Sequence, residues 1–381
     1  MTKYISSWMV QVAVFYRVVA SHGAPALAAL LLVGGLPPLI LGPMLGAAVD
    51  RWNVRRTVLL TNAMLTATLL AVALLINGPL GPLVAGYSVL NLLSTVDRPS
   101  RQRWLYQTVG PSERARANAS LGAVAGLVTV IGAALGGGAA LAGAGPILLT
   151  AAAFRLLTAG VLAALPATAT AHPTGRPASY GHAIREGLEA VRRFPQAGRV
   201  LLVGAAWGLI GGGYDVILTA YGVHRWGGGV GVGVLYAADG AGVLVGTMLA
   251  RAVRHWRRVS VYGWAYIAQG ALWGGFALAG QFPLAVSLLL LMRVASGLII
   301  AWDTTLLLET VPDAVHGRVY SLHTTTYGAV MRGALLVTGL LITVVGVQAI
   351  AVGAGIGSMV VGLVWWATGG TRRAPMARLE P

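Results

Sequence analysis

Seven charged side chains interrupt long apolar stretches of this sequence: Arg17, Arg155, Asp215, Asp239, Arg293, Asp303 and Arg332. A charge in such surroundings must be paired or hydrated, because an isolated one costs at least about 2.5 kcal/mol at the centre of a bilayer. A carboxylate that alternates between burial and a nearby arginine can bind and release a proton, whereas a fixed arginine partner would lock it as an ion pair. Asp215, Asp303 and Asp239 are therefore candidates for carrying protons, with Asp215 as the first choice and Asp303 as the next.

Aromatic side chains accompany several of these charges. Tyr16, Tyr214 and Trp302 each directly precede a charged residue, and Trp207 stands two helical turns before Tyr214. Their rings could offer flat faces to a large amphipathic ligand, although the same residue types form the aromatic belts at membrane interfaces. Tyr214 and Trp302 are the stronger ligand candidates, because an acid is adjacent to each.

The composition indicates which elements must position these residues. The chain is 56% hydrophobic and 10% charged, whereas a soluble domain is roughly 25% charged, so its solvent is a lipid bilayer. Since a span needs about 20 apolar residues, 381 residues allow about twelve spans with short connections. We predict spans at 4–21, 25–49, 56–77, 82–105, 117–141, 146–166, 198–222, 228–250, 259–280, 284–310, 319–342 and 346–368. Arg17, in the apolar centre of the first span, argues against a secretory signal there.

The net charge of +16 is distributed by side of the membrane and does not form one patch. Basic residues gather in every second connection, at 3, 51–56, 114–116, 176–199, 251–258, 318 and 372–378. Such connections face the cytoplasm. We therefore predict a multi-pass protein of the plasma (inner) membrane with both termini cytoplasmic and no nucleic-acid partner. With no cysteine, the chain has neither disulfides nor thiolate metal sites, and we expect no cofactor and no metal.

One long connection divides the predicted spans six and six. Residues 1–168 form the expected first bundle, 169–197 a cytoplasmic linker with an amphipathic helix, and 198–381 the second bundle. The halves share a short repeat, because Gly46 followed by Arg51 recurs as Gly246 followed by Arg251, 200 residues later. Such repetition is typical of transporters built from two related halves.

The stretch "GAAVDRWNVRR" at 46–56 resembles a signature of the major facilitator superfamily, G-x-x-x-D-R-x-G-R-[RK], in which Asn53 here replaces a glycine. "GAALGG" at 132–137 resembles that superfamily's antiporter signature G-P-x-x-G-G, with Ala133 in place of proline. Together with "RPSRQRWLYQTVGPSERARANASL" and "VPDAVHGRVYSL", these stretches resemble the branch that contains the enterobactin exporter and macrolide efflux proteins. The resemblance implies an all-α membrane protein of twelve transmembrane helices in two pseudo-symmetric six-helix bundles.

The resemblance also assigns expected roles to residues. Spans one, four, seven and ten would line the cavity, and Arg155 in span six would be a packing or snorkelling residue. The expected cavity residues are Arg17, Tyr16, Trp207, Tyr214, Arg293, Trp302 and Arg332. A paired network joining spans eight, ten and eleven through Asp239, Arg293 and Arg332 is the alternative. The expected cytoplasmic gate comprises Gly46, Asp50, Arg51, Arg55, Asp97, Arg98, Arg101 and Arg318, and the antiporter-motif packing comprises Gly132, Gly136 and Gly137.

These observations favour one function class over two others. A membrane enzyme would need a convergent catalytic set, and the sequence has neither H-E-x-x-H nor a nucleophile elbow. A channel would show rings of like residues or a filter sequence. We expect a secondary active transporter that exports a small amphipathic molecule of drug or siderophore type in exchange for protons. Such a chain would work as a monomer by alternating access. Import or facilitative uniport is the alternative.

Asp50→Asn should favour the state open to the cytoplasm and lower transport. In the expected gate this carboxylate faces the N-terminus of span eleven near Arg318, an arrangement worth about 0.3 to 1 kcal/mol or more. The amide keeps the shape of the side chain and loses the charge. Labelling of cysteines engineered on the two faces of the cysteine-free chain measures the shift. An unchanged labelling pattern would contradict the gate.

Overall fold

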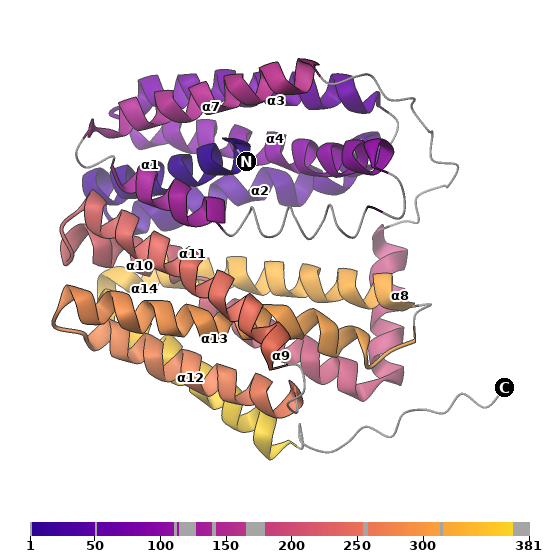
Figure 1. Cartoon of the computed structure of the whole chain (residues 1–381). Helices are drawn as coiled ribbons and strands as arrows, with labels where there is room; N and C mark the ends of the chain where they lie inside the picture. Colours follow the sequence, from indigo (N-terminus) through magenta and orange to yellow (C-terminus); the bar gives the residue numbers. More distant parts are fainter. Residues whose placement is uncertain are drawn as a thin grey trace. The chain divides into compact units, whose positions relative to one another are not determined.

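The computed structural model describes residues 2–49, 52–109, 113, 127–138, 142–164, 180–253, 258–312 and 315–368. Every regular element in these ranges is a helix, as the composition predicted (Figure 1). Within them, seven helical segments have the length and hydropathy to cross a bilayer. The first half of the chain contains α1 (Thr2–His22), α2 (Ala24–Val49), α3 (Val54–Leu75), α4 (Leu80–Thr108), a helix at Leu127–Gly137 and α7 (Ala144–Ala164).

The second half begins with the amphipathic helix α8 (Tyr180–Arg193), which the linker sequence predicted. It continues with α9 (Pro195–Gly211), α10 (Tyr214–His224), α11 (Gly229–Ala252), α12 (Arg258–Leu278), α13 (Phe282–Leu308) and α14 (His316–Ala367). The helix α14 contains both of the last two predicted spans. Gly346 separates them with φ 82° and ψ 157°, a backbone conformation that glycine adopts without a steric penalty.

The predicted seventh span is not one continuous helix. Helix α9 ends at Gly211, a turn occupies Gly212 and Gly213, and α10 begins at Tyr214. Three consecutive glycines favour the break, because glycine stabilises a helix least among residues other than proline. The break places Asp215 in the first turn of α10, where the partial positive charge of a helix N-terminus favours a carboxylate.

The first helix also differs from its prediction in one respect. Because α1 extends from Thr2 to His22, Arg17 lies near its C-terminal end and not at its centre. Lys3, in contrast, belongs to the first turn of α1 and not to a connection before it. The helix therefore carries a cation near each end.

The chain divides into two compact units that do not follow its two halves. The first unit comprises residues 1–184 together with 212–241 and 332–350, and the second comprises 185–211, 242–331 and 351–381. One boundary falls inside α8, between residues 184 and 185, and the next coincides with the break at Gly211 and Gly212. All of α10 and parts of α11 and α14 thus belong to the unit that contains the helices of the first half.

Close glycine contacts hold the first unit together. In it, α3 packs against α4 and α7, and α1 packs against α2, α7 and α10 (Figure 1). Gly132 and Gly136 adjoin α1, where a Cβ would lie 2.7 Å from Trp8 and 2.8 Å from Val12, respectively. Gly137 faces Gly233 of α11 so closely that a Cβ on Gly233 would lie 2.5 Å from its Cα. Small residues allow such approaches between membrane helices.

A buried polar chain joins three helices in the second unit. The Ser296 hydroxyl of α13 donates to Gln269 of α12 at 2.8 Å, and Gln269 donates to Ser358 of α14 at 3.2 Å. Ser358 in turn donates to the Tyr266 carbonyl at 2.8 Å. Each side chain in this series of hydrogen bonds has a partner. The series therefore fixes how α12, α13 and the end of α14 pack against one another.

Gly137→Ala should lower the unfolding temperature by roughly 3–10 °C, because the new Cβ would overlap α11, with Gly229 O and Gly233 N both at 3.0 Å. Gly160→Ala in α7 is the matched control, since a Cβ there meets nothing within 4 Å. We expect the control to be unchanged or slightly stabilised, because alanine favours helix over glycine. Thermal unfolding of the purified protein in detergent measures both. Equal unfolding temperatures would contradict the close contact.

Candidate functional site

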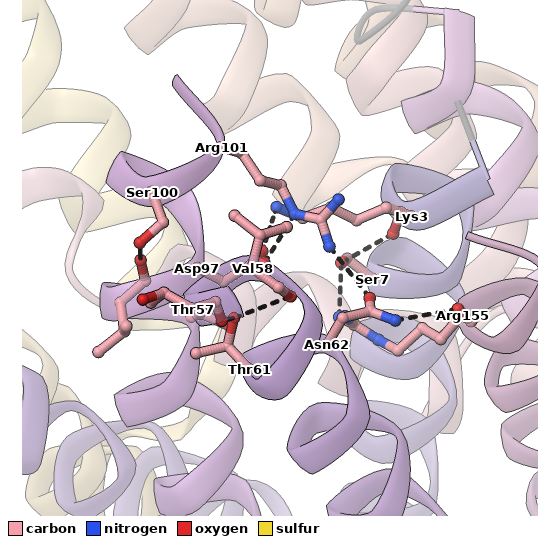
Figure 2. A network of polar contacts seen from close by, with 12 residues as sticks. Lys3, Ser7, Thr57, Val58, Thr61, Asn62, Asp97, Ser100, Arg101 and Arg155 are labelled. Atoms are coloured by element: carbon pink, nitrogen blue, oxygen red, sulfur yellow. Dashed lines mark hydrogen bonds and ion pairs between the residues drawn. The ribbon is translucent and has the colours of Figure 1, made fainter. Parts of the chain in front are cut away.

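A charged cluster joins α1 to α4 around Asp97, whose side chain is 1% exposed (Figure 2). Lys3 Nζ lies 2.5 Å from Asp97 Oδ2, and Arg101 Nε donates to Asp97 Oδ1 at 2.7 Å. One carboxylate thus has a cation on each oxygen. Lys3 was considered in the sequence only as a residue that orients the chain, and the structure makes it a partner of Asp97.

The cluster continues into α3 and α7. Arg101 also donates to Asn62 Oδ1 of α3 at 3.0 Å, and Asn62 Nδ2 donates to the Arg155 carbonyl of α7 at 3.2 Å. The Arg155 guanidinium donates to Ser7 of α1 at 3.3 Å, and Arg155 is only 5% exposed (Figure 2). Arg155 is therefore a packing residue, and it does not reach out to the membrane surface. We call Lys3, Ser7, Asn62, Asp97, Arg101 and Arg155 the Asp97 network.

Two arginines near this end of the first unit bind the carbonyl groups at helix ends. Arg55 donates to Ala163 O at the end of α7 at 2.8 Å, and Arg103 donates to Val49 O at the end of α2 at 3.0 Å. Cations are favourable there, because the last carbonyls of a helix carry partial negative charge. Arg98, which we grouped with Asp97 and Arg101, has an exposed side chain.

The predicted latch is only partly within the described residues. Asp50 and Arg51 lie outside them, so the expected contact with the start of span eleven stays a prediction. Gly46 belongs to α2, and Arg318 lies in the first turn of α14 with an exposed side chain. Asn53, which replaces the signature's glycine, caps α3 by accepting a hydrogen bond from the Arg56 backbone at 3.0 Å.

Two tyrosine–aspartate pairs cross between α10 and α11. Tyr214 of α10 donates to Asp239 of α11 at 2.5 Å, and Tyr236 of α11 donates to Asp215 of α10 at 2.9 Å. The buried ring of Tyr236 has its centroid 6.3 Å from that of Trp8, on α1. The structure therefore brings Tyr214, Asp215 and Asp239 together, with a tyrosine hydroxyl on each of the two acids.

The two cavity candidates of the first span lie toward its C-terminal end. Tyr16 and Arg17 are half-buried, and the Tyr16 ring approaches Gly228 in the turn between α10 and α11, at 3.9 Å from a Cβ built there. Tyr16 therefore lies beside that turn, and Arg17 follows it in α1. Roles in ligand binding for either residue stay predictions.

The two remaining arginines lie in different units. Arg332 of α14 passes Gly35 of α2, where a Cβ would lie 3.3 Å from its Nε. Arg293 of α13 packs on Gly242 of α11, at 2.6 Å between a built Cβ and its own Cβ. Each arginine thus crosses a helix where a glycine leaves space for it.

A third aspartate, Asp303 of α13, is held on both oxygens in the second unit. Tyr262 of α12 donates to Oδ1 at 2.5 Å, and His323 Nε2 of α14 lies 2.7 Å from Oδ2. The Tyr262 ring is in turn fixed edge-on between Tyr266 and Trp365, each with its centroid 5.2 Å away. Trp302, predicted to face a ligand, is 5% exposed in the same apolar core.

A hollow adjoins the Asp303–His323 pair. It is lined by side chains of α9, α13 and α14, namely Trp207, Ile300, Asp303, Thr304, Tyr320, His323, Thr324 and Tyr327. Trp207 and Tyr327 pack with ring centroids 5.7 Å apart. Ile300 and Tyr320 are 39% and 45% exposed, so one side of the hollow is open. We call this the α9–α13–α14 hollow.

Two glycines of α9 allow α14 to approach closely, Gly204 beside His323 and Gly208 beside Tyr327. A Cβ at Gly204 would overlap the imidazole, with Nδ1 at 3.0 Å, and one at Gly208 would lie 2.9 Å from the Tyr327 carbonyl. Their spacing of four residues puts both on one face of α9. This face allows α14 to approach until His323 reaches Asp303.

Several functional groups were missed by reading the sequence alone. Lys3, Asn62, Tyr236 and Tyr262 have partners far away in the chain, and no local pattern marks them. His323 did carry a signal, because it is the one histidine that falls inside a predicted span. A histidine inside an apolar span needs a polar partner, as an arginine there does, and this is the signal that could have identified His323.

Asp97→Asn should destabilise the protein strongly, because it leaves the half-buried cations Lys3 and Arg101 beside each other without the buried carboxylate that both contact. Removing one partner of a buried pair costs about 3–5 kcal/mol, which is roughly 6–20 °C in unfolding temperature. The exposed neighbour Arg98→Gln is the control and should shift it by less than about 2 °C. Thermal unfolding in detergent measures both. A small effect of Asp97→Asn would rule out the network as a stabilising element.

Comparison with known proteins agrees with the geometry. The profile of the Major Facilitator Superfamily matches residues 1–334. No curated protein sequence matches the chain.

Solved structures share its fold at low identity. A POT family transporter in complex with a thioalcohol-conjugated peptide has a TM-score of 0.74 at 12% identity, over 97% of this chain and 95% of that one. The nucleoside transporter NupG has a TM-score of 0.70 at 11% identity, over 96% of each chain. A bacterial homologue of the human lysosomal transporter Spinster, inward-facing and unoccupied, has 0.65 at 13%, over 96% and 94%. The family profile matches most of the chain, and the described helices include segments long and apolar enough to cross a membrane. The chain therefore belongs to the Major Facilitator Superfamily and is a multi-pass membrane transporter.

Proposed function

We propose that this transporter exports a small amphipathic molecule in exchange for protons by alternating access. The direction rests on the sequence at 132–137, which resembles an antiporter signature, and on the resemblance to an efflux branch. The coupling rests on one observation, the contact of 2.7 Å between His323 and Asp303 beside the α9–α13–α14 hollow.

The Asp303–His323 pair suits proton coupling because one member changes charge easily. Histidine is the side chain whose charge changes most readily near neutral pH, and an adjacent carboxylate stabilises its protonated form. Tyr262 holds the other carboxylate oxygen at 2.5 Å, so the carboxylate keeps its orientation when the imidazole gains or loses a proton. The pair is neutral when His323 is protonated and carries one negative charge when it is not.

Asp215, the first choice from the sequence, has a different kind of partner. Asp215 accepts a hydrogen bond from the Tyr236 hydroxyl, and Asp239 accepts one from the Tyr214 hydroxyl. We place proton carriage first on Asp303 because a histidine contacts it beside the hollow. Asp215 and Asp239 are the second candidates.

Alternating access needs parts that move and parts that stay together. The break between α9 and α10 falls where the two compact units divide, so Gly212 and Gly213 are suited to act as a hinge. The segments 212–241 and 332–350 flank the connections that we assign to the outer face, and they pack with helices of the first half. In this proposal they close the outer side, both termini are cytoplasmic, and the monomer acts in the plasma membrane.

Asp303→Asn and His323→Gln should each abolish accumulation driven by a proton gradient and leave downhill exchange intact, since only the coupling step needs a titratable group. The assay uses inverted membrane vesicles that contain the full chain. Ethidium, erythromycin and 2,3-dihydroxybenzoate serve as probes of three chemical classes. His224 is exposed, so His224→Gln is the matched histidine control and should behave as the wild type.

Four results would contradict the proposal. Full gradient-driven accumulation by Asp303→Asn would exclude that carboxylate, and loss in Asp215→Asn alone would move the role to Asp215. Accumulation that follows the opposite gradient direction would favour import, and flux that equilibrates without any dependence on the proton gradient would favour uniport.

A further inference from the structure

The α9–α13–α14 hollow combines aromatic faces with an acid at its base. Trp207 and Tyr327 lie at an interplanar angle of 32°, and Tyr320 stands at the open side with 45% exposure. Asp303, only 7% exposed, lies deeper among the lining residues. A molecule that enters therefore meets ring faces first and a carboxylate behind them.

The charges of the lining decide the sign of the ligand. Neither lysine nor arginine is among the lining residues, and the charged groups are Asp303 and His323. With His323 neutral the lining carries one negative charge, and with His323 protonated it carries none. An anionic ligand would thus meet no net positive charge in either state, whereas a cation would meet a negative one in the first state.

We infer that the α9–α13–α14 hollow binds an organic monocation with an aromatic ring, and that Asp303 is its counter-charge only while His323 is neutral. The inference rests on the proposed function, whose substrate class it names. The faces of Trp207 and Tyr327 attract the cation through their ring quadrupoles. The inner end of the cation replaces the imidazolium as the charge beside Asp303.

The exchange balances in protons and charge. When the monocation enters, His323 gives its proton to water, and no covalent bond forms or breaks. One positive charge arrives and one leaves, so the exchange of one proton for one monocation is electroneutral. Binding should accordingly tighten as the pH rises, by at most about tenfold per pH unit for one linked proton.

Within the described residues, the other titratable groups that line the hollow or contact Asp303 are tyrosines. Tyr262 contacts Asp303 directly and Tyr266 packs on Tyr262, both from α12. From α14, Tyr320 and Tyr327 line the hollow, while the lining residue of α9 is Trp207. Because tyrosines stay neutral between pH 6 and 8, the predicted pH dependence is assigned to His323 with Asp303.

The experiment measures binding of benzyltrimethylammonium to the full chain in detergent by calorimetry at pH 6, 7 and 8. Its charge is permanent, so any pH dependence belongs to the protein. We expect tighter binding at higher pH and release of about one proton, obtained from buffers with different ionisation enthalpies. Neopentylbenzene, of the same shape without the charge, and benzoate should bind at least tenfold more weakly. Equal binding of either would overturn the inference.

Variants separate the roles of the residues. His323→Gln should bind the monocation with no pH dependence between pH 6 and 8, and Asp303→Asn should weaken binding at least tenfold. Trp207→Ala should weaken it roughly threefold to thirtyfold, and Trp207→Phe should restore most of the loss, since a ring face remains. Unchanged binding in Asp303→Asn or Trp207→Ala would overturn the site. If Asp303→Asn does not fold, the comparison of Trp207→Ala with Trp207→Phe decides.

The failure of this inference is distinguishable from the failure of the proposed function. If Asp303→Asn and His323→Gln lose proton-driven accumulation of any probe but benzyltrimethylammonium does not bind, coupling stands and the substrate class is wrong. If the monocation binds with the predicted pH dependence but both variants keep proton-driven accumulation, the hollow is a binding site and the coupling proposal fails.

Discussion

A carboxylate buried among membrane helices is stable only beside a donor or cation, and in this transporter another helix supplies at least one partner. Asp97 of α4 has Lys3 of α1, Asp239 of α11 has Tyr214 of α10, and Asp303 of α13 has Tyr262 of α12 with His323 of α14. Each acid therefore acts as a tie between helices. Because breaking such a tie leaves a buried charge, these contacts constrain how the helices can pack or move.

The partners of these acids differ in chemical type. The difference separates acids that hold helices together from an acid that we propose for proton coupling. In the Asp97 network Lys3 and Arg101 both contact one acid, and Arg101 donates to the Asn62 amide, so that the network spans α1, α3, α4 and α7 (Figure 2). Such a cluster suits a structural tie in the first unit. The acid of α13 instead faces an imidazole, a type of group that can bind and release a proton, next to the α9–α13–α14 hollow. The requirement that a buried acid has a partner is thus met in two ways, by a structural cluster around Asp97 and by the Asp303–His323 pair, whose charge can change.

Close helix approach is what brings these partners within reach. Lipid provides no hydrophobic drive between helices, so small residues and good packing must allow the contact. Gly204 leaves the space for His323, and Gly137 meets Gly233 where the first half of the chain packs with α11. The glycine break before Tyr214 has the opposite effect, because it interrupts a helix where the compact units divide. Glycine therefore serves both the tight contacts and the proposed hinge of the transport cycle.

The sequence by itself determined the properties that depend on local composition. Apolar runs located the helices to within a few residues, the linker predicted α8, and Asp215, Asp239 and Asp303 stood out because acids are costly in apolar runs. Only the tertiary structure decided which residues pair with each other. Lys3 meets Asp97 across 94 residues of chain and Tyr262 meets Asp303 across 41, and no periodicity encodes such distances. The break in span seven and the assignment of 212–241 to the first unit were likewise decided by packing, because they depend on contacts that a hydropathy pattern does not contain.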